Sequence, residues 1–100
     1  MNKKGNSENT IDLSILPESP GVYQFFDNSG QIIYVGKAKN LKKRVSSYFN
    51  RDNSQSNKIN VLVSKINRIE YIVVATEADA LLLENNLIKR YRPRYNVMLK

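Results

Sequence analysis

Residues 21–36 read GVYQFFDNSGQIIYVG, which is two apolar runs separated by four turn-forming residues. Both runs are rich in β-branched and aromatic side chains, which favour strands. The connecting residues Asp27-Asn28-Ser29-Gly30 are typical of a short loop between antiparallel strands. The stretch therefore predicts a β-hairpin.

The length of that loop predicts which residues face each other. With a four-residue loop Phe26 pairs with Gln31, which places Tyr23 opposite Tyr34 and Gly21 opposite Gly36. A register shifted by two residues would change the pairs and still keep both tyrosines on one face, whereas a three-residue loop would separate them.

Capping residues and apolar periodicity predict the elements around this hairpin. A short helical turn is expected within 11–20, which the breakers Pro17 and Pro20 follow. Three longer helices are expected over 41–49 with Asn40 as cap, over 58–66, and over 76–91 with Thr76 as cap and an end before Pro93. Residues 70–75 read as a third strand, expected at the centre because its apolar run does not alternate. The order is that of an α+β fold, a small mixed or antiparallel sheet with helices against it.

The composition limits both the size and the chemistry of the protein. The chain has 100 residues, 41% hydrophobic and 25% charged, which suits a single small domain. We assign residues 1–10 to a disordered tail and 11–100 to the domain. Cys and His are both absent, which excludes disulfides, thiolate and imidazole metal ligands, and serine–histidine pairs. Catalysis would have to use carboxylates, Tyr, Lys, Arg or a hard metal ion.

The charge is strongly positive and unevenly distributed. Sixteen Lys and Arg against nine Asp and Glu give a formal net charge of +7, which indicates a polyanionic partner, either nucleic acid or an anionic membrane surface. No apolar run approaches the roughly 20 residues of a membrane span. Eleven cations fall in two segments that also carry aromatic residues: Lys37, Lys39, Lys42, Lys43, Arg44 and Arg51, then Lys89, Arg90, Arg92, Arg94 and Lys100. This pattern favours a phosphate-binding groove over a solvated helix face.

Glu84 is the residue that packing explains least well. On a helix over 76–91 it falls in the middle of an apolar face made by Ala80, Leu81, Leu83, Leu87, Ile88 and Tyr91. An unpaired carboxylate there is costly, so Glu84 either reaches an arginine or solvent, or acts as a metal ligand or general acid/base. Glu77 and Asp79 lie in the first turn, where acids complement the helix dipole, and we assign them to structure.

The two hairpin tyrosines also allow two interpretations. Facing aromatic residues are common cross-strand packing. However, Gly36-Lys37 follows Tyr34 directly and offers bare backbone beside an ammonium where a phosphate could approach. The basic helix that carries Arg44 comes next, so the same pair also fits a phosphate site.

These residues resemble a known family. Gly21-Val22-Tyr23 and Tyr34-Val35-Gly36 resemble the paired signature of the GIY-YIG nucleases, with Val in place of each Ile. The continuation from Tyr34 to Phe49, the segment Thr76-Glu77, the helix around Leu81–Lys89 and the stretch Tyr91–Asn96 resemble the N-terminal domain of the excinuclease C family. The resemblance covers the chain from about Leu16 onward.

The resemblance implies a three-stranded antiparallel sheet flanked by helices, and a single divalent ion, Mg²⁺ or Mn²⁺. It implies incision of damaged DNA on the 3′ side of a lesion during nucleotide excision repair. Glu84 would be the metal ligand, Tyr23 and Tyr34 would line the site with Tyr34 preferred as base, Lys37 would assist the proton transfer, and Arg44 would contact the scissile phosphate. The supporting residues would be Gly36, Tyr48 and Asn96, and the further DNA-binding residues would be Lys39, Lys42, Lys43, Arg51, Arg92 and Arg94.

The resemblance also implies the setting in which the domain acts. Its partners would be damaged double-stranded DNA and the excinuclease B protein, with the excinuclease A protein indirectly, through segments outside this chain. We expect an isolated domain that is monomeric and lies in the bacterial cytoplasm, with no membrane contact. The alternatives are a catalytically silent nucleic-acid-binding module, another nuclease of the same fold, and a basic membrane-surface helix. The presence of Glu84, Arg44 and both tyrosines favours the nuclease.

Overall fold

The computed structural model describes residues 11–50 and 56–98. Their elements, in chain order, are a short 3₁₀ helix η2 (Leu13–Ile15), β1 (Gly21–Phe26), β2 (Ile32–Ala38), α1 (Leu41–Tyr48), α2 (Asn57–Lys65), β3 (Arg68–Val73), α3 (Glu77–Tyr91) and α4 (Arg94–Met98). The predicted tail 1–10 and Arg51 lie outside the described residues. Within the described ranges, no helix is both long and apolar enough to cross a membrane.

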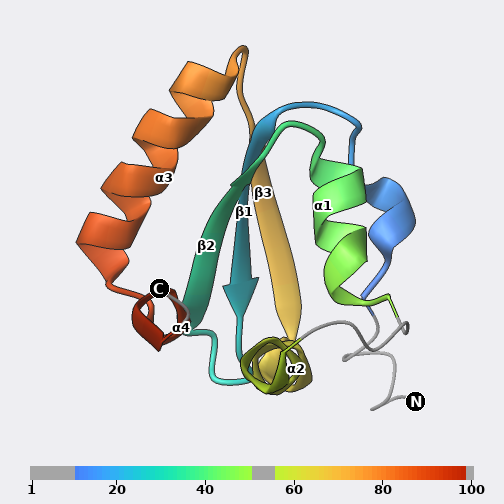
Figure 1. The fold of residues 1–100 in the computed structure, drawn as a ribbon, viewed down its shortest axis with the longest axis vertical. Coiled ribbons are helices and arrows are strands. Elements are labelled where there is room, and N and C mark those ends of the chain that lie inside the picture. Colours follow the sequence, from blue (N-terminus) through green and yellow to red (C-terminus); the bar gives the residue numbers. More distant parts are fainter. Residues whose placement is uncertain (1–10, 51–55, 99–100) are drawn as a thin grey trace.

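The sheet has three antiparallel strands in the order β2-β1-β3 (Figure 1). The predicted fold class is therefore confirmed. The prediction of a central third strand is wrong, because β1 occupies the centre and β3 is an edge strand. In β3 the apolar side chains of Ile72 and Val73 are 40% and 50% exposed. The apolar residues of this strand suggested burial on both faces, but they lie on an edge strand and are partly exposed.

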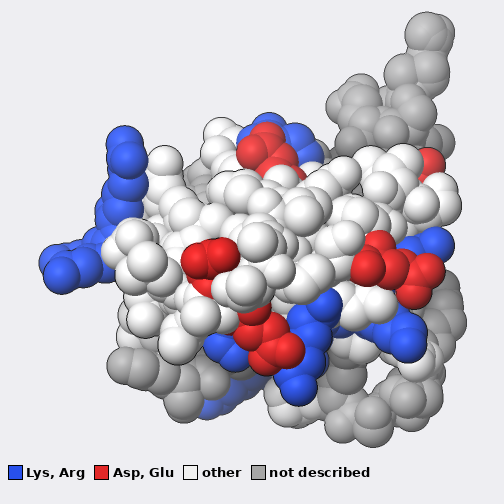
Figure 2. Space-filling model, turned by 90° about the horizontal axis from the view of Figure 1, so that it is seen from above, with Lys and Arg blue, Asp and Glu red and all other residues white. Residues whose placement is uncertain are grey.

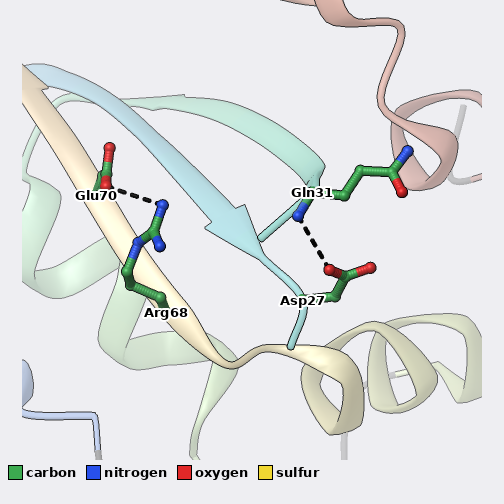
Figure 3. A network of polar contacts seen from close by, with 4 residues as sticks. All are labelled: Asp27, Gln31, Arg68 and Glu70. Carbon is green, nitrogen blue, oxygen red and sulfur yellow. Dashed lines mark hydrogen bonds and ion pairs between the residues drawn. The ribbon is translucent and has the colours of Figure 1, made fainter. Parts of the chain in front are cut away.

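The hairpin forms as predicted, but with a different register. The Asp27 amide donates to the carbonyl of Gln31, so the connection is one residue longer than the expected loop. The Asp27 carboxylate accepts a hydrogen bond from the Gln31 amide (Figure 3). It also accepts one from the Ser29 amide, and together these bonds organise the turn. Phe26 consequently pairs with Ile32 rather than with Gln31.

A bulge next to Phe26 shifts the remaining pairs once more. Tyr23 lies opposite Gly36, and Phe25 lies opposite Tyr34. The predicted pairing of Tyr23 with Tyr34 is therefore wrong. The longer loop and the bulge together shift the register by two residues for these pairs. A shift of two keeps each side chain on its side of the sheet, so both tyrosines still face the same side, as the alternative register predicted.

The helices begin where their capping residues predict. The side chain of Asn40 accepts from the Lys43 amide at 3.0 Å, and the hydroxyl of Thr76 accepts from the Asp79 amide at 3.1 Å. The helix α3 ends at Tyr91 because Arg92 adopts the left-handed conformation at φ 45° before Pro93. The helix α4, which was not predicted, then returns the chain to β2.

The two faces of the sheet carry two separate cores. The first lies under α1 and η2 and contains Tyr23, Phe25, Leu41 and Tyr48. The second lies under α3 and is built on Val22, Val35 and Ala80. Figure 1 shows α3 alongside β2 and α1 on the other side of the sheet. The loop between β2 and α1 therefore lies at the same end of the molecule as the start of α3.

The apolar face of α3 is narrower than its periodicity predicted. Ala80 is buried, and Leu83, Leu87 and Ile88 pack against the second core. In contrast, Leu81 and Tyr91 are each 47% exposed. The helix covers β2 and β1 and leaves β3 open on that side, where an ion pair between Arg68 and Glu70 lies on the strand (Figure 3).

Candidate active site

Three tyrosines from three elements meet on the α1 face of the sheet. Tyr23 of β1 and Tyr48 of α1 are almost fully buried, and Tyr34 of β2 is partly buried. The ring of Tyr34 has its centroid 6.3 Å from that of Tyr23 and 6.3 Å from that of Tyr48. The sequence predicted Tyr23 and Tyr34 as a pair, and the structure adds Tyr48 as the third member of one cluster.

Gly36 makes this cluster possible. It lies opposite Tyr23, and a methyl group on it would overlap the ring carbons and the hydroxyl of Tyr23. The absence of a side chain at Gly36 thus leaves room for a buried phenol. This corrects the sequence-based expectation that the bare backbone of Gly36 would be open to a phosphate, because Gly36 is itself buried.

A polar network joins the cluster to the basic helix α1. The hydroxyls of Tyr23 and Tyr48 are hydrogen-bonded at 2.7 Å, and the Arg44 guanidinium donates to the Tyr48 hydroxyl at 3.3 Å. Arg44 lies one helical turn before Tyr48, and its guanidinium carbon is 5.1 Å from the centre of that ring. The network holds one end of the guanidinium against the core while the residue remains exposed.

Burial controls the protonation of these groups. It is the largest cause that raises the pKa of Tyr23 and of Tyr34, and the nearby charge of Glu84 raises the pKa of Tyr34 further. Burial also raises the pKa of Tyr48. For Arg44 burial acts in the opposite direction, but its interactions with the three phenols outweigh it and the pKa of Arg44 is raised. At neutral pH the phenols are therefore neutral and the guanidinium is charged.

Glu84 lies on α3, close enough to Tyr34 to affect its pKa. The residue is partly buried, and within residues 11–50 and 56–98 its carboxylate makes no hydrogen bond or ion pair. The sequence left open a partner arginine for Glu84, and no such pair forms among those residues. A carboxylate without a described partner and close to a phenol fits Mg²⁺, which needs few protein ligands and keeps several waters. The described part of the chain holds no cluster of three or more acidic ligands.

Asn96 of α4 supports the strand that carries Tyr34. Its side-chain oxygen accepts from the Val35 amide at 2.9 Å, and its side-chain nitrogen donates to the Val35 carbonyl at 2.9 Å. Val35 is fully buried on the outer side of β2, where no further strand pairs with it among the described residues. The Asn96 side chain thus makes the two backbone hydrogen bonds that a neighbouring strand would make with Val35. The supporting role that the resemblance implies for Asn96 would act through these two hydrogen bonds.

A cleft of about 440 Å³ lies between the end of β2, the start of α1 and the first turns of α3. Its lining includes four of the predicted cations, and it also includes residues not predicted as functional, such as Ser47 and Glu77. The described lining residues are Lys37, Ala38, Lys39, Asn40, Lys43, Arg44, Ser47, Glu77 and Ala80. Figure 2 looks down on this end of the molecule, where basic and acidic side chains lie next to one another.

Three other described residues that were predicted to bind DNA do not line this cleft, namely Lys42, Arg92 and Arg94. Arg92 ends α3, which places it about 22 Å along the helix from Glu77. Arg94 lines a different cavity near the hairpin turn and stacks on Tyr95. Lys42 is partly buried and is not part of the cleft lining. The structure therefore separates the two basic segments that the sequence grouped together.

Comparison with known proteins identifies the family. A family model described as the UvrC-like GIY-YIG domain matches residues 19–97. The chain belongs to the UvrC-like GIY-YIG family. The protein C of the UvrABC system is 67% identical over 90 residues in Christiangramia forsetii and 69% identical over 85 residues in Bacteroides thetaiotaomicron. These matches cover 90% and 85% of this chain but only 15% and 14% of the relatives, so the chain spans about one seventh of their length.

Solved structures agree with this assignment. The GIY-YIG N-terminal endonuclease domain of UvrC from Thermotoga maritima, bound to magnesium as its catalytic divalent cation, is 41% identical with a TM-score of 0.74. The match covers 95% of this chain and 98% of that domain. A variant of the same domain with one Tyr replaced by Phe is also bound to its catalytic cation. The predicted enzyme class, a GIY-YIG endonuclease domain of the UvrC family, is thereby confirmed.

Proposed function

We propose that this chain hydrolyses a phosphodiester of damaged double-stranded DNA on the 3′ side of a lesion, in bacterial nucleotide excision repair. The observation that carries the proposal is the convergence of Arg44 and three phenols on one side of β2. Glu84 lies close enough to affect the pKa of Tyr34, and its carboxylate has no ion-pair partner among the described residues. The endonuclease assignment of the Thermotoga maritima domain supports it.

Glu84 would hold one divalent ion, Mg²⁺ or Mn²⁺. When bound, such an ion stabilises negative charge on the oxygens of the phosphate and of the leaving group. Glu84 is suited to this role because α3 holds it partly buried and no other side chain of the described residues competes for it. The magnesium bound to the Thermotoga maritima domain supports this choice of ion.

Arg44 would contact the phosphate that is cut. Its guanidinium lines the cleft and also donates to Tyr48, so it enters the reaction already oriented. A fixed cation that faces developing negative charge stabilises the transition state without reorganisation. Tyr48 and Tyr23 would maintain this orientation from inside the core.

Tyr34 would accept a proton from the attacking water, and Lys37 would assist the transfer. The raised pKa of Tyr34 opposes this role in the protein alone, since a neutral phenol is a poor base. Arg44 lowers the pKa of Tyr34, whereas Glu84 raises it through its negative charge. Neutralising that charge at Glu84 would remove one of the causes that keep the phenol protonated.

The partners of the reaction lie outside this chain. The excinuclease B protein, and the excinuclease A protein indirectly, would deliver the damaged DNA through parts of the longer relatives that have no counterpart in these 100 residues. The reaction would take place in the cytoplasm of a bacterium. The isolated domain would act as a monomer.

A nicking assay tests the proposal. Lesion-containing duplex DNA is incubated with the partner proteins and the chain, with Mg²⁺ or with a chelator, for the native protein, Glu84→Gln and Tyr34→Phe. We expect nicks on the 3′ side only with the native protein and Mg²⁺. Asp79→Asn, which removes an exposed acid from the same helix, is the control and should cut normally. Full activity of Glu84→Gln would refute the metal site, and normal cutting by Tyr34→Phe would refute Tyr34 as the base.

A further inference from the structure

Glu77 and Glu84 lie on the same side of α3. They are seven residues apart, which brings them within about 20° of each other around the helix and separates them by about 10.5 Å along it. Ala80 lies between them and is almost completely buried. Because α3 runs antiparallel to β2 (Figure 1), Glu84 lies beside Tyr34 whereas Glu77 lies at the Lys37–Lys39 end of that strand.

Glu77 and Glu84 have different neighbours. Glu77 lines the cleft between β2, α1 and α3, whereas Glu84 is not part of that lining and lies close enough to Tyr34 to affect its pKa. Glu77 therefore belongs to a position next to the proposed metal site.

That neighbouring position is the cleft of about 440 Å³. Among the described residues, four cations and one acid line it. Lys37 and Lys39 come from the end of β2 and its loop, Lys43 and Arg44 come from α1, and the acid is Glu77. Among residues 11–50 and 56–98, none of these cations forms an ion pair. The excess of positive charge in one concave surface fits a phosphate, and Ser47 and Asn40 add polar groups to the lining.

We propose that this cleft is a second phosphate subsite, which binds a backbone phosphate of the DNA strand next to the one that is cut. The inference rests on the proposed nuclease function and specifies how the substrate is held. Lys39 and Lys43 bind the flanking phosphate, while Arg44 lies between this subsite and the tyrosine cluster. Glu77 repels the phosphate from the α3 side, which weakens binding and keeps the strand against α1 and β2.

The test measures DNA binding separately from cutting. The 100-residue chain is titrated with a fluorescent lesion-containing duplex in chelator at several salt concentrations. A single phosphate contact adds about one unit to the slope of log affinity against log salt. We expect Lys39→Gln and Lys43→Gln each to weaken binding several-fold and to lower that slope by about one. The control Lys89→Gln, on an exposed residue about 18 Å along α3 from Glu77, should change neither quantity.

The acids provide a matched pair. Glu77→Gln and Asp79→Asn remove the same charge from the first turn of α3, but only Glu77 lines the cleft. We expect Glu77→Gln to strengthen DNA binding and Asp79→Asn to leave it close to native. Equal effects of the two acid variants, or equal effects of the Lys43 and Lys89 variants, would overturn the subsite.

The outcomes also separate this inference from the function on which it rests. Native protein that cuts DNA while the cleft variants bind as tightly as native would refute the subsite and leave the nuclease intact. Native protein that binds DNA through Lys39 and Lys43 but never cuts it would refute the proposed function and leave the subsite as a DNA-binding surface.

Discussion

The hydroxyl oxygens of Tyr23 and Tyr48 lie 2.7 Å apart in the interior of the protein, where the two residues are 1% and 4% exposed. Arg44 also donates to the Tyr48 hydroxyl, so a buried pair of phenols orients a cation that faces the cleft. Core packing and the phosphate contact proposed for Arg44 therefore depend on the same hydrogen bonds. Substitutions within the core are expected to affect catalysis as well as stability.

Tyr48→Phe tests this dependence. The change leaves the buried Tyr23 hydroxyl without its partner, which costs about 1–3 kcal/mol of unfolding free energy, and it removes the acceptor of Arg44. Urea denaturation should report the loss of stability, and nicking should fall by more than the unfolded fraction explains. Tyr71→Phe, on an exposed edge residue, is the control. A Tyr48→Phe protein as stable and active as native would show that the pair contributes nothing.

The same phenols predict how stability depends on pH. Burial raises the pKa of Tyr23 and Tyr34 in the folded protein above the ordinary value of 10.0. Above about pH 10 the unfolded chain loses phenolic protons that the folded protein keeps, so the free energy of unfolding falls as pH rises. Below that pH both states keep these protons, and the tyrosines add no pH dependence. Urea titrations across the alkaline range should show a smaller fall for Tyr34→Phe than for native protein.

Gly36→Ala should damage the site through packing alone. The added methyl group would overlap the Tyr23 ring and hydroxyl, which lie inside a filled core. We expect a loss of about 1–3 kcal/mol in unfolding free energy and a disturbed Tyr23–Tyr48 hydrogen bond. Gly30→Ala is the control, since a methyl group there meets no atom within 4 Å and is strained only by the φ of +85°. It should lose stability without a specific loss of nicking.

Asn96→Ala should weaken the outer side of β2. Both backbone groups of the buried Val35 would lose their partner, at a cost of about 1–3 kcal/mol for each. Asn96→Asp would keep an acceptor for the Val35 amide and place an oxygen against the Val35 carbonyl. Amide hydrogen exchange at Val35 should therefore accelerate more in the alanine variant than in the aspartate variant. Equal protection of Val35 in the native and alanine proteins would contradict the role of Asn96.

Metal binding can be followed without any DNA. An ion that binds only the folded protein stabilises it by about 2.7 kcal/mol at 100 times its Kd. Thermal unfolding with increasing Mg²⁺ or Mn²⁺ should shift upward for native protein and for Glu77→Gln, and should not shift for Glu84→Gln. A shift that survives in Glu84→Gln and disappears in Glu77→Gln would move the ion to the cleft.

Local signals in the sequence were sufficient for the helices and strands of the fold other than α4. Asn40 and Thr76 begin helices because their side chains accept from amides within three residues, an interaction that needs no tertiary contact. The hairpin register was harder to predict. It depends on the hydrogen bond from the Asp27 amide to the Gln31 carbonyl, which makes the connection one residue longer than expected, and on a bulge next to Phe26. Each of these changes the pairing by one residue.

Glu84 could be recognised from the sequence as an acid on an apolar helix face. Helical spacing alone shows which residues lie next to it on the same helix, and no tertiary contact is needed. Glu77 has the same spacing signal, seven residues before Glu84, but the dipole of the first turn already explained an acid there. The basic residues were also indistinguishable in the sequence. The tertiary structure separates Lys39 and Lys43 from Arg92 and Arg94, because α3 carries the chain to the far end of β2.

The sequence by itself thus determined the hairpin, the capped helices and the excess of positive charge. It also determined the small set of residues that could take part in catalysis. These properties arise from short-range geometry and composition. Only the tertiary structure decided that β1 is central, that Gly36 makes room for Tyr23, and that Glu77 and four cations share a cleft. Those relationships join residues that are far apart in the chain, and they are set by how the helices pack on the two faces of the sheet.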